Sequence, residues 1–534
     1  MSSTTLGLKY LAVGCFVLAL GVRALSALPI QQPGYMDAYY YYNVAEALKS
    51  GQGFTDHILW NYLDNPAGIP HPACLYWMPL TAALIYPFFL LFGASFRAAQ
   101  IPFVLLSALV AVITYRVSLE LSASRWQAAL AAGLMVVSGF YTVYWVVTDS
   151  FAPFAVAGSL ALFSAGRGIR DRRLAWFALS GLCAGLAHLT RADGILVLVA
   201  IVLAALWGGW RLRLRGKTVL AACALSILAY LAAMSPWLYR NWREMGTLMP
   251  SSGLQTVFLT NYDDLFAYGR ELTRSSYLAW GWAQILNSKL QALWFGAQNL
   301  AAVNLMIFLV PLAVIGLWSW RRKAELMPVV TYGALLYATM TLVFSFPGVR
   351  GGLFHSSAVL LPWLFAAAAQ GLDQLIGTVA ERRASWQPGP ARTFFFSGTL
   401  VLAALLSGFL YWRAVQGAPG TSLPWNERDG VYAEIGRWLG QNADAQAVVM
   451  VNNAPAFYYH THHPSLSIPS EDLDGTLDAA RRYKAEYLVL EYDHPRPLRE
   501  VYEGNVADPR LELAATMLDG LERPVKIYRL ETGR

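Results

Sequence analysis

Two acidic residues lie beside apolar segments of the chain, where a carboxylate is costly and usually has a function. The first, Asp37, follows the apolar run 7–28 and begins a stretch that ends at Gly51. This stretch reads as a short surface helix with Asp37 near its N-terminus and Gly51 at its end. A carboxylate held at the membrane surface can take a proton from an acceptor that comes to the bilayer. The alternative is that Asp37 only caps the helix.

The second acidic residue, Asp149, begins the run Asp149-Ser150-Phe151 directly after Tyr144-Trp145. We expect it to emerge on the same side of the membrane as Asp37. N-capping of the following helix is again the simpler interpretation. The functional interpretation is a catalytic role, because a carboxylate that borders hydrocarbon is costly and usually has a partner or a function.

Basic residues, histidines and one further acid occur in the segments that we predict to share this side. They are His71 in 68–72, Arg191 and Asp193 in 188–194, Arg240 and Arg243 in 236–243, and Arg350 and His355 in 347–355. Guanidinium groups bind phosphate oxygens bidentately, so the set predicts a site for a lipid phosphate. Two simpler interpretations stay open: contacts of single arginines with lipid headgroups, and a salt-bridged turn at Arg191 and Asp193.

A metal site is conceivable at the same place. Asp37, Asp149 and a histidine offer the ligands of a hard cation such as Mg²⁺ or Mn²⁺, although no spacing in the sequence requires one. The tail segment 460–463, His-Thr-His-His, reads as a surface loop rather than a metal site. No cofactor is therefore firmly indicated.

The composition is that of a chain whose main solvent is lipid. Of its 534 residues 56% are hydrophobic and only 14% are charged, and apolar runs near the length of a membrane span recur along it. The net charge of +7 comes from short basic clusters between these runs. Such clusters orient a membrane protein, and they do not form the basic face of a nucleic-acid binder.

About eleven helical spans are predicted. They cover 7–28, 98–117, 127–147, 149–166, 174–189, 194–210, 218–236, 298–319, 327–346, 354–377 and 394–412. Arginines and lysines gather in every second loop, which places those loops and the N-terminus in the cytoplasm and the C-terminus outside, at the plasma membrane. The apolar segment 75–93 would break this alternation if it spanned, so we expect a helix lying in the outer interface, with Tyr76, Trp77 and Tyr86 at headgroup depth.

Two long outer loops, 29–97 and 237–297, and the tail 413–534 are predicted outside the spans. The tail is polar, and it alternates expected strands with expected helices. The strands are 447–451, 486–491 and 525–530, and the helices are 430–439 and 473–483. The prediction is a polytopic helical module, 1–412, followed by a small extracytoplasmic α/β domain, 413–534.

Together these features resemble the GT-C superfamily of membrane glycosyltransferases. The resemblance lies in a carboxylate just after the first span, a Pro-x-x-x-Tyr-Trp segment from Pro72 to Trp77, a second acid at the start of a later span, and an outer soluble tail. It is strongest to the branch that contains the protein O-mannosyltransferases and the lipid A aminoarabinose transferase. Asp37 is followed by Ala38 and not by a second acid, unlike the mannosyltransferases, which argues against a protein hydroxyl as acceptor.

The resemblance implies an inverting enzyme with a polyprenyl-phosphate sugar as donor and a lipid, glycan or protein as acceptor. It makes Asp37 the general base, with Arg191, Arg240 and Arg350 stabilising the departing phosphate. Asp149 matches the second acidic position of the family, where it would orient the acceptor or Asp37, or hold a metal. The main alternative is a non-catalytic transporter or flippase. Transporters place ionisable groups at the membrane midplane, whereas here only His188 is near the interior of a span.

Overall fold

The computed structural model describes residues 3–531 except 214, 251 and 384. The chain divides into two compact units. The first comprises Met1–Pro29, Gln100–Leu248 and Asn287–Trp412, and the second comprises Ile30–Ala99, Met249–Leu286 and Arg413–Arg534. One division therefore falls where the polar tail begins, and the second unit also takes in most of both outer loops.

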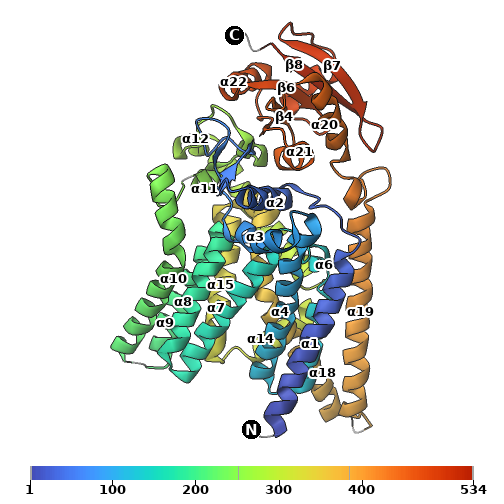
Figure 1. The fold of residues 1–534 in the computed structure, drawn as a ribbon. Coiled ribbons are helices and arrows are strands. Elements are labelled where there is room, and N and C mark those ends of the chain that lie inside the picture. Colours follow the sequence, from blue (N-terminus) through green and yellow to red (C-terminus); the bar gives the residue numbers. More distant parts are fainter. Residues whose placement is uncertain (1–2, 214, 251, 384, 532–534) are drawn as a thin grey trace. The chain divides into compact units, whose positions relative to one another are not determined.

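The first unit is helical (Figure 1), and a helix forms within every predicted span. The helices are α1 (Ser3–Ala27), α4 (Phe96–Ser122), α5 (Arg125–Val137), α7 (Phe151–Asp171), α8 (Leu174–Thr190), α9 (Ile195–Arg211), α10 (Gly216–Met245), α14 (Val310–Ser319), α15 (Met327–Ala338), α18 (Leu361–Arg382) and α19 (Pro388–Gln416). Among the described residues seven helical segments are long and apolar enough to cross a membrane. The helical membrane fold predicted from the sequence is therefore confirmed.

The predicted span 127–147 is not one helix. α5 ends at Val137, because Ser138 and Gly139 both adopt left-handed backbone conformations, with φ of 46° and 56°. A Cβ atom on Gly139 would lie 2.8 Å from the side chain of Met306, so only glycine fits there without displacement. The chain then passes through α6 (Tyr141–Tyr144) and a turn before α7 begins at Phe151. The prediction of a continuous span was wrong here, since hydropathy does not register a backbone break.

Other predicted spans are interrupted in a similar way. The π-helix Leu300–Asn304 is separated from α14 by Met306 and Ile307, which also have positive φ. Two further π-helices, Thr339–Val343 and Gly348–Gly352, lie between α15 and the short helix α17 (Leu353–Ser357). π-Helical turns are rare in proteins overall, and those that occur often lie at functional sites.

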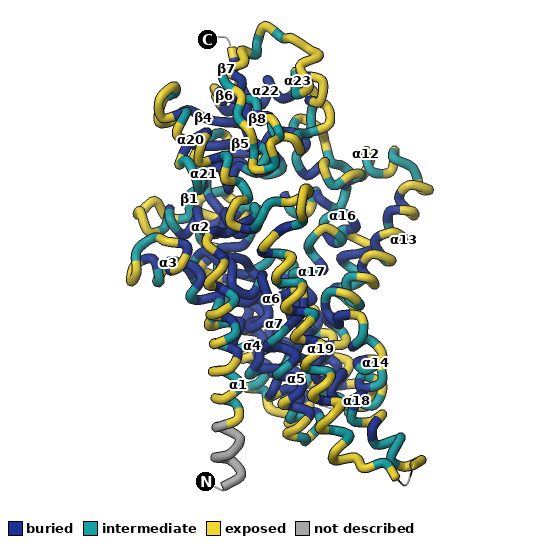
Figure 2. The backbone as a smooth tube through the Cα atoms, turned by 90° about the vertical axis from the view of Figure 1, so that its right-hand side faces the viewer, coloured by how far each residue is buried: buried dark blue, intermediate teal, exposed yellow. Residues whose placement is uncertain are grey.

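Burial distinguishes the helices of this unit (Figure 2). In the most apolar window of α7, 83% of the residues are buried, against 17% for α19. The helix that begins just after Asp149 is therefore enclosed by protein, whereas α19 presents most of its side chains to the surroundings.

The predicted outer loop 237–297 is shorter than expected. α10 continues to Met245, and α12 (Arg274–Ala279) and α13 (Trp282–Asn299) occupy its second half. Arg240 and Arg243 consequently lie on the last turns of a helix and not in a loop.

The second unit is built on a six-stranded sheet with the strand order β2-β5-β4-β6-β8-β7. Its strands are β2 (Ile58–Leu59), β4 (Val448–Val451), β5 (Ser465–Ser467), β6 (Ala485–Leu490), β7 (Leu511–Leu518) and β8 (Pro524–Leu530). The first four pair in parallel, and β8 and β7 are antiparallel additions. Helices α20 (Gly430–Asn442), α21 (Ala454–Thr461) and α22 (Leu473–Tyr483) accompany the sheet, as predicted for an α/β tail.

The first outer loop supplies several helices and strands to this unit. β2 pairs with β5, and its Leu59 joins the core around Met450 and Leu488. Helix α2 (Met36–Lys49) forms where a short helix was predicted, but nine of its 14 residues are buried, so the prediction of a surface helix was wrong. α3 (Leu80–Phe92) lies in the segment predicted to be interfacial. α3 has 13 residues, which is too short for a span of about 20 residues. Trp77 stacks on Trp60 with ring centroids 4.1 Å apart, so its ring packs within the unit; the interfacial position of α3 stays a prediction.

Candidate active site

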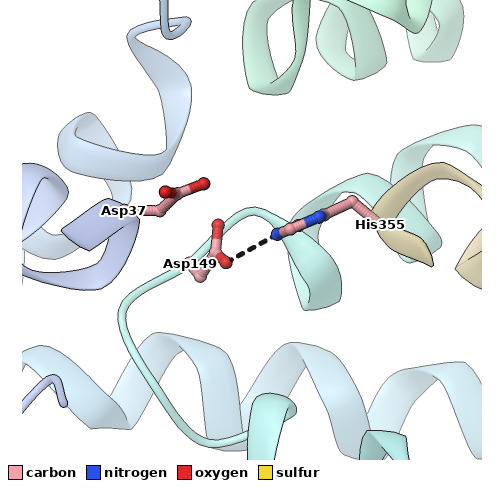
Figure 3. Close-up of side chains that lie close together, drawn as sticks. All are labelled: Asp37, Asp149 and His355. Atoms are coloured by element: carbon pink, nitrogen blue, oxygen red, sulfur yellow. Dashed lines mark hydrogen bonds and ion pairs between the residues drawn. The ribbon is translucent and has the colours of Figure 1, made fainter. Parts of the chain in front are cut away.

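Asp149 is a buried carboxylate on the turn that enters α7. Its side chain is 1% exposed, and one oxygen accepts a hydrogen bond from the backbone N–H of Ser150. The other oxygen lies 2.9 Å from Nε2 of His355 (Figure 3). The N-cap residue of α7 is Ser150 and not Asp149. Asp149 is thus paired with a histidine from a segment 206 residues further along the chain.

The hydrogen bonds of His355 fix the protons of this pair. Its Nδ1 lies 2.9 Å from the carbonyl oxygen of Gly351, and a carbonyl only accepts, so Nδ1 carries a hydrogen. The other ring nitrogen, Nε2, then faces a carboxylate oxygen of Asp149. Both of these atoms carry lone pairs, so at 2.9 Å they need a cation between them. A proton fills that place if the pair is an imidazolium with a carboxylate. An imidazole held through Nδ1 in this way is also suited to bind a metal ion through Nε2.

A second buried network holds the residues that follow both members of the pair. Nε of Arg191 donates to Asp193 at 3.0 Å and to the hydroxyl of Ser356 at 3.1 Å, and Nη1 lies 3.3 Å from the hydroxyl of Ser150. Ser356 also donates to Asp193. The side chains of Arg191 and Asp193 are only 16% and 13% exposed. The salt-bridged turn considered for these residues is present, and it is connected to the neighbours of Asp149 and His355.

The other face of α17 is fixed by uncharged groups. The hydroxyl of Tyr141 donates to the carbonyl of Phe354 at 2.8 Å, and the amide of Asn304 donates to the carbonyl and hydroxyl of Ser357. Phe151 stacks on the imidazole of His355 with centroids 4.0 Å apart. His355 is therefore held on several sides. The sequence does not single out Ser356, Asn304 or Tyr141, because a serine, an asparagine or a tyrosine in an apolar run carries no distinctive signal.

Arg240 and Arg350 occupy different settings in the same unit. Arg240 lies 4.7 Å above the ring of Trp237 on α10, with Nη1 3.3 Å from the side-chain oxygen of Asn241. Arg350 is an exposed residue of the π-helix Gly348–Gly352, five positions before His355. Their role as phosphate ligands stays a prediction.

Asp37 lies in the first turn of α2 in the second unit and is partly buried. The N-cap residue of α2 is Tyr35, which makes no side-chain capping hydrogen bond. Asp37 is therefore not the cap. A carboxylate in a first helical turn lies beside the positive end of the helix dipole.

His71 is engaged within the second unit. Its two ring nitrogens lie 2.9 Å from the carbonyl oxygens of Pro72 and Ile58. Both ring nitrogens thus face backbone oxygens, and Asp56 lies close enough to interact electrostatically with the ring. Burial raises the pKa of Asp56 to about 6, and the charge of His71 opposes that rise. A donor phosphate or a metal could use His71 only if these backbone contacts were given up, so its predicted binding role would require rearrangement.

Comparisons with known proteins agree with this fold. Residues 70–239 match the family described as dolichyl-phosphate-mannose-protein mannosyltransferase. A search of curated proteins finds no match. The structure resembles ArnT from Cupriavidus metallidurans bound to undecaprenyl phosphate, with 15% identity, a TM-score of 0.55, and 99% of this chain and 98% of that chain covered. Its apo form gives the same identity and coverage with a TM-score of 0.56.

A second resemblance is to the oligosaccharyltransferase AglB from Archaeoglobus fulgidus, in complex with an inhibitory peptide and a dolichol-phosphate. The identity is 13% and the TM-score 0.56, and the match covers 90% of this chain and 69% of that one. The family match over residues 70–239 and the two similar folds agree with the resemblance predicted from the sequence.

Proposed function

We propose that the chain is an inverting glycosyltransferase that moves a sugar from a polyprenyl-phosphate donor to an acceptor hydroxyl at the outer membrane surface. The observation that carries the proposal is the buried Asp149–His355 pair, ordered on both sides by hydrogen bonds, in a fold like that of ArnT with undecaprenyl phosphate. A transporter has no evident need for a carboxylate and an imidazole held so rigidly.

Asp37 acts as the general base in this proposal. It takes the proton of the acceptor hydroxyl, and the oxygen attacks the anomeric carbon from the face opposite the phosphate. The new glycosidic bond forms as the bond between that carbon and the phosphate oxygen breaks, and the configuration inverts. The polyprenyl phosphate leaves with the electron pair of the broken bond and gains negative charge.

That growing charge needs stabilisation more than protonation. Arg240 and Arg350 are the proposed cations for it. The guanidinium of Arg191 already contacts Asp193, Ser356 and Ser150, so its part is to hold the site. Asp149 orients the acceptor or Asp37, and the 2.9 Å contact with His355 holds its carboxylate in place. If a divalent cation binds, these two residues would hold it, and it would act as an electrostatic aid to the phosphate.

The cellular placement belongs to the same proposal. Basic clusters in alternate loops support a cytoplasmic N-terminus and an outer C-terminal tail in the plasma membrane. A donor whose carrier chain stays in hydrocarbon while its phosphate reaches the surface also accounts for a membrane-embedded enzyme.

The test is transfer of sugar by purified protein from a polyprenyl-phosphate donor. Asp37→Asn is expected to abolish turnover while leaving the binding of polyprenyl phosphate intact, because the change removes the base but keeps the shape. Asp263→Asn is the matched control, since Asp263 is also an acid in a first helical turn of the second unit, and it is expected to retain turnover. Full activity of Asp37→Asn would remove Asp37 from the mechanism. Movement of an intact lipid-linked sugar across vesicles, with no transfer, would establish the flippase alternative.

A further inference from the structure

Arg23 is a fully buried arginine near the C-terminal end of the mainly apolar helix α1. Its side chain is 0% exposed. Nη2 donates to the carbonyl of Met135 and to the hydroxyl of Ser138, both at 2.8 Å, and the guanidinium lies 5.7 Å above the ring of Trp145. Among the described residues no carboxylate forms an ion pair with it. A buried charge without a counter-ion is costly, so its position calls for an explanation.

The contacts of Arg23 lie at the C-terminal end of α5. That helix stops at Val137, and Ser138 takes a left-handed conformation at its C-cap. The last carbonyls of a helix have no partner within the helix, and water is not available to them in an apolar surrounding. A cation at a helix C-terminus is also favoured by the helix dipole. Arg23 therefore supplies both a hydrogen bond and a positive charge where α5 is interrupted.

The interruption decides where Asp149 lies. If α5 continued without a break, residue 149 would stand about 18 Å beyond Val137 along the helix axis, at 1.5 Å per residue. Instead the chain turns at Ser138 and Gly139, forms α6, and brings Trp145 under the guanidinium four residues before Asp149. One arginine thus contacts the segment at its start, at Met135 and Ser138, and again at Trp145.

We propose that Arg23 is a positioning residue for Asp149. It stabilises the break after α5 and fixes the segment 138–149, so that the Asp149 carboxylate meets His355. Its complete burial leaves no surface for a donor phosphate, which separates this role from that of a phosphate ligand. The catalytic consequence rests on the proposed glycosyltransferase function, but the structural consequence does not.

The experiment compares Arg23→Met and Arg23→Gln with wild type in detergent-solubilised full-length protein. Arg392→Met is the matched control. Arg392 pairs with Asp373, which also accepts a hydrogen bond from Gln127 near the start of α5, so the control perturbs the opposite end of the same helix. Two quantities are measured: turnover with its KM for the donor, and the ¹⁵N resonances of the His355 imidazole, identified by their loss in His355→Gln.

A displaced carboxylate is expected to shift the His355 resonances and to lower turnover in Arg23→Met by about 100-fold, with the donor KM nearly unchanged. Arg23→Gln keeps an amide donor without the charge, and a loss of about tenfold is expected. Resonances and turnover equal to those of Arg392→Met in both variants would overturn the proposal. If Arg23→Met does not fold, the same two measurements on Arg23→Gln alone test the proposal. Shifted resonances in a protein that transfers no sugar, even as wild type, would refute the glycosyltransferase and keep the positioning role.

Discussion

The pair Arg191–Asp193 allows the sharpest test of how the site is held. The sequence alone predicts that Arg191 binds the donor phosphate, whereas its contacts in the structure make it a support for Ser150 and Ser356. The informative change is Asp193→Asn, which keeps the shape of the side chain and removes its charge. It leaves Arg191 buried without its carboxylate.

The cost of this change follows from the burial of the pair. Removing one member of a fully buried ion pair typically costs about 3–5 kcal/mol, and the 16% and 13% exposure of these side chains places the expectation below that range, at about 2–3 kcal/mol. Release of Ser150 and Ser356 is expected to move Asp149 and His355 by a fraction of an ångström to one ångström. A misplacement of that size lowers turnover by about 100-fold.

The assay is a double-mutant cycle of Arg191→Gln and Asp193→Asn, read by chemical unfolding and by turnover. Because the two residues act as a unit, the double variant is expected to lose about as much stability as either single variant, a coupling of about 2–3 kcal/mol. The donor KM should change little in all three. Additive losses, or a donor KM that rises strongly in Arg191→Gln but not in Asp193→Asn, would refute the supporting role and restore the phosphate ligand.

Two further outcomes are expected. Dialysis against EDTA should leave turnover unchanged, because a proton suffices between Asp149 and His355; activity that returned only with Mg²⁺ or Mn²⁺ would replace that proton by a metal. In the second unit, burial raises the pKa of Glu491 to about 8, although Tyr432 donates to it at 2.6 Å. A carboxyl with a raised folded-state pKa stabilises the fold below its ordinary pKa of 4.5 and loses that contribution as pH rises towards 8. Glu491→Gln should therefore flatten the decline in thermal stability between about pH 5 and pH 8, and an unchanged slope would contradict the assignment.

The sequence predicts an element well when the residues that determine it lie close together in the chain. The helix 473–483 forms with the predicted bounds, because Asp472 caps its first turn and its apolar positions repeat with helical spacing. Strand β5 has three residues and β2 only two, too few for an alternating pattern. The pairing of β2 with β5 joins residues about 400 positions apart, and no feature of the sequence near Ile58 predicts it.

In the candidate site, too, the sequence identifies single residues but not the contacts between distant ones. Asp37, Asp149 and His355 could be identified as candidates because charged or titratable groups stand out against apolar runs. The pairing of Asp149 with His355 could not be predicted, because it depends on how the chain folds at the helix breaks in two separate predicted spans. Arg23 was overlooked for a related reason: a single basic residue near the end of an apolar run resembles an ordinary flanking charge.

Helix breaks explain why several polar residues stand within apolar segments of this chain. Each break in a membrane helix exposes backbone groups that lipid cannot satisfy. Arg23 accommodates the carbonyl of Met135, Ser407 accepts from the backbone N–H of Gly139, and the amide of Asn304 donates to the carbonyl of Ser357. All three positions adjoin the segments that carry Asp149 and His355. In a chain of this class, an isolated polar residue in a predicted span is therefore evidence for a neighbouring break, and breaks that converge in this way indicate where the chemistry takes place.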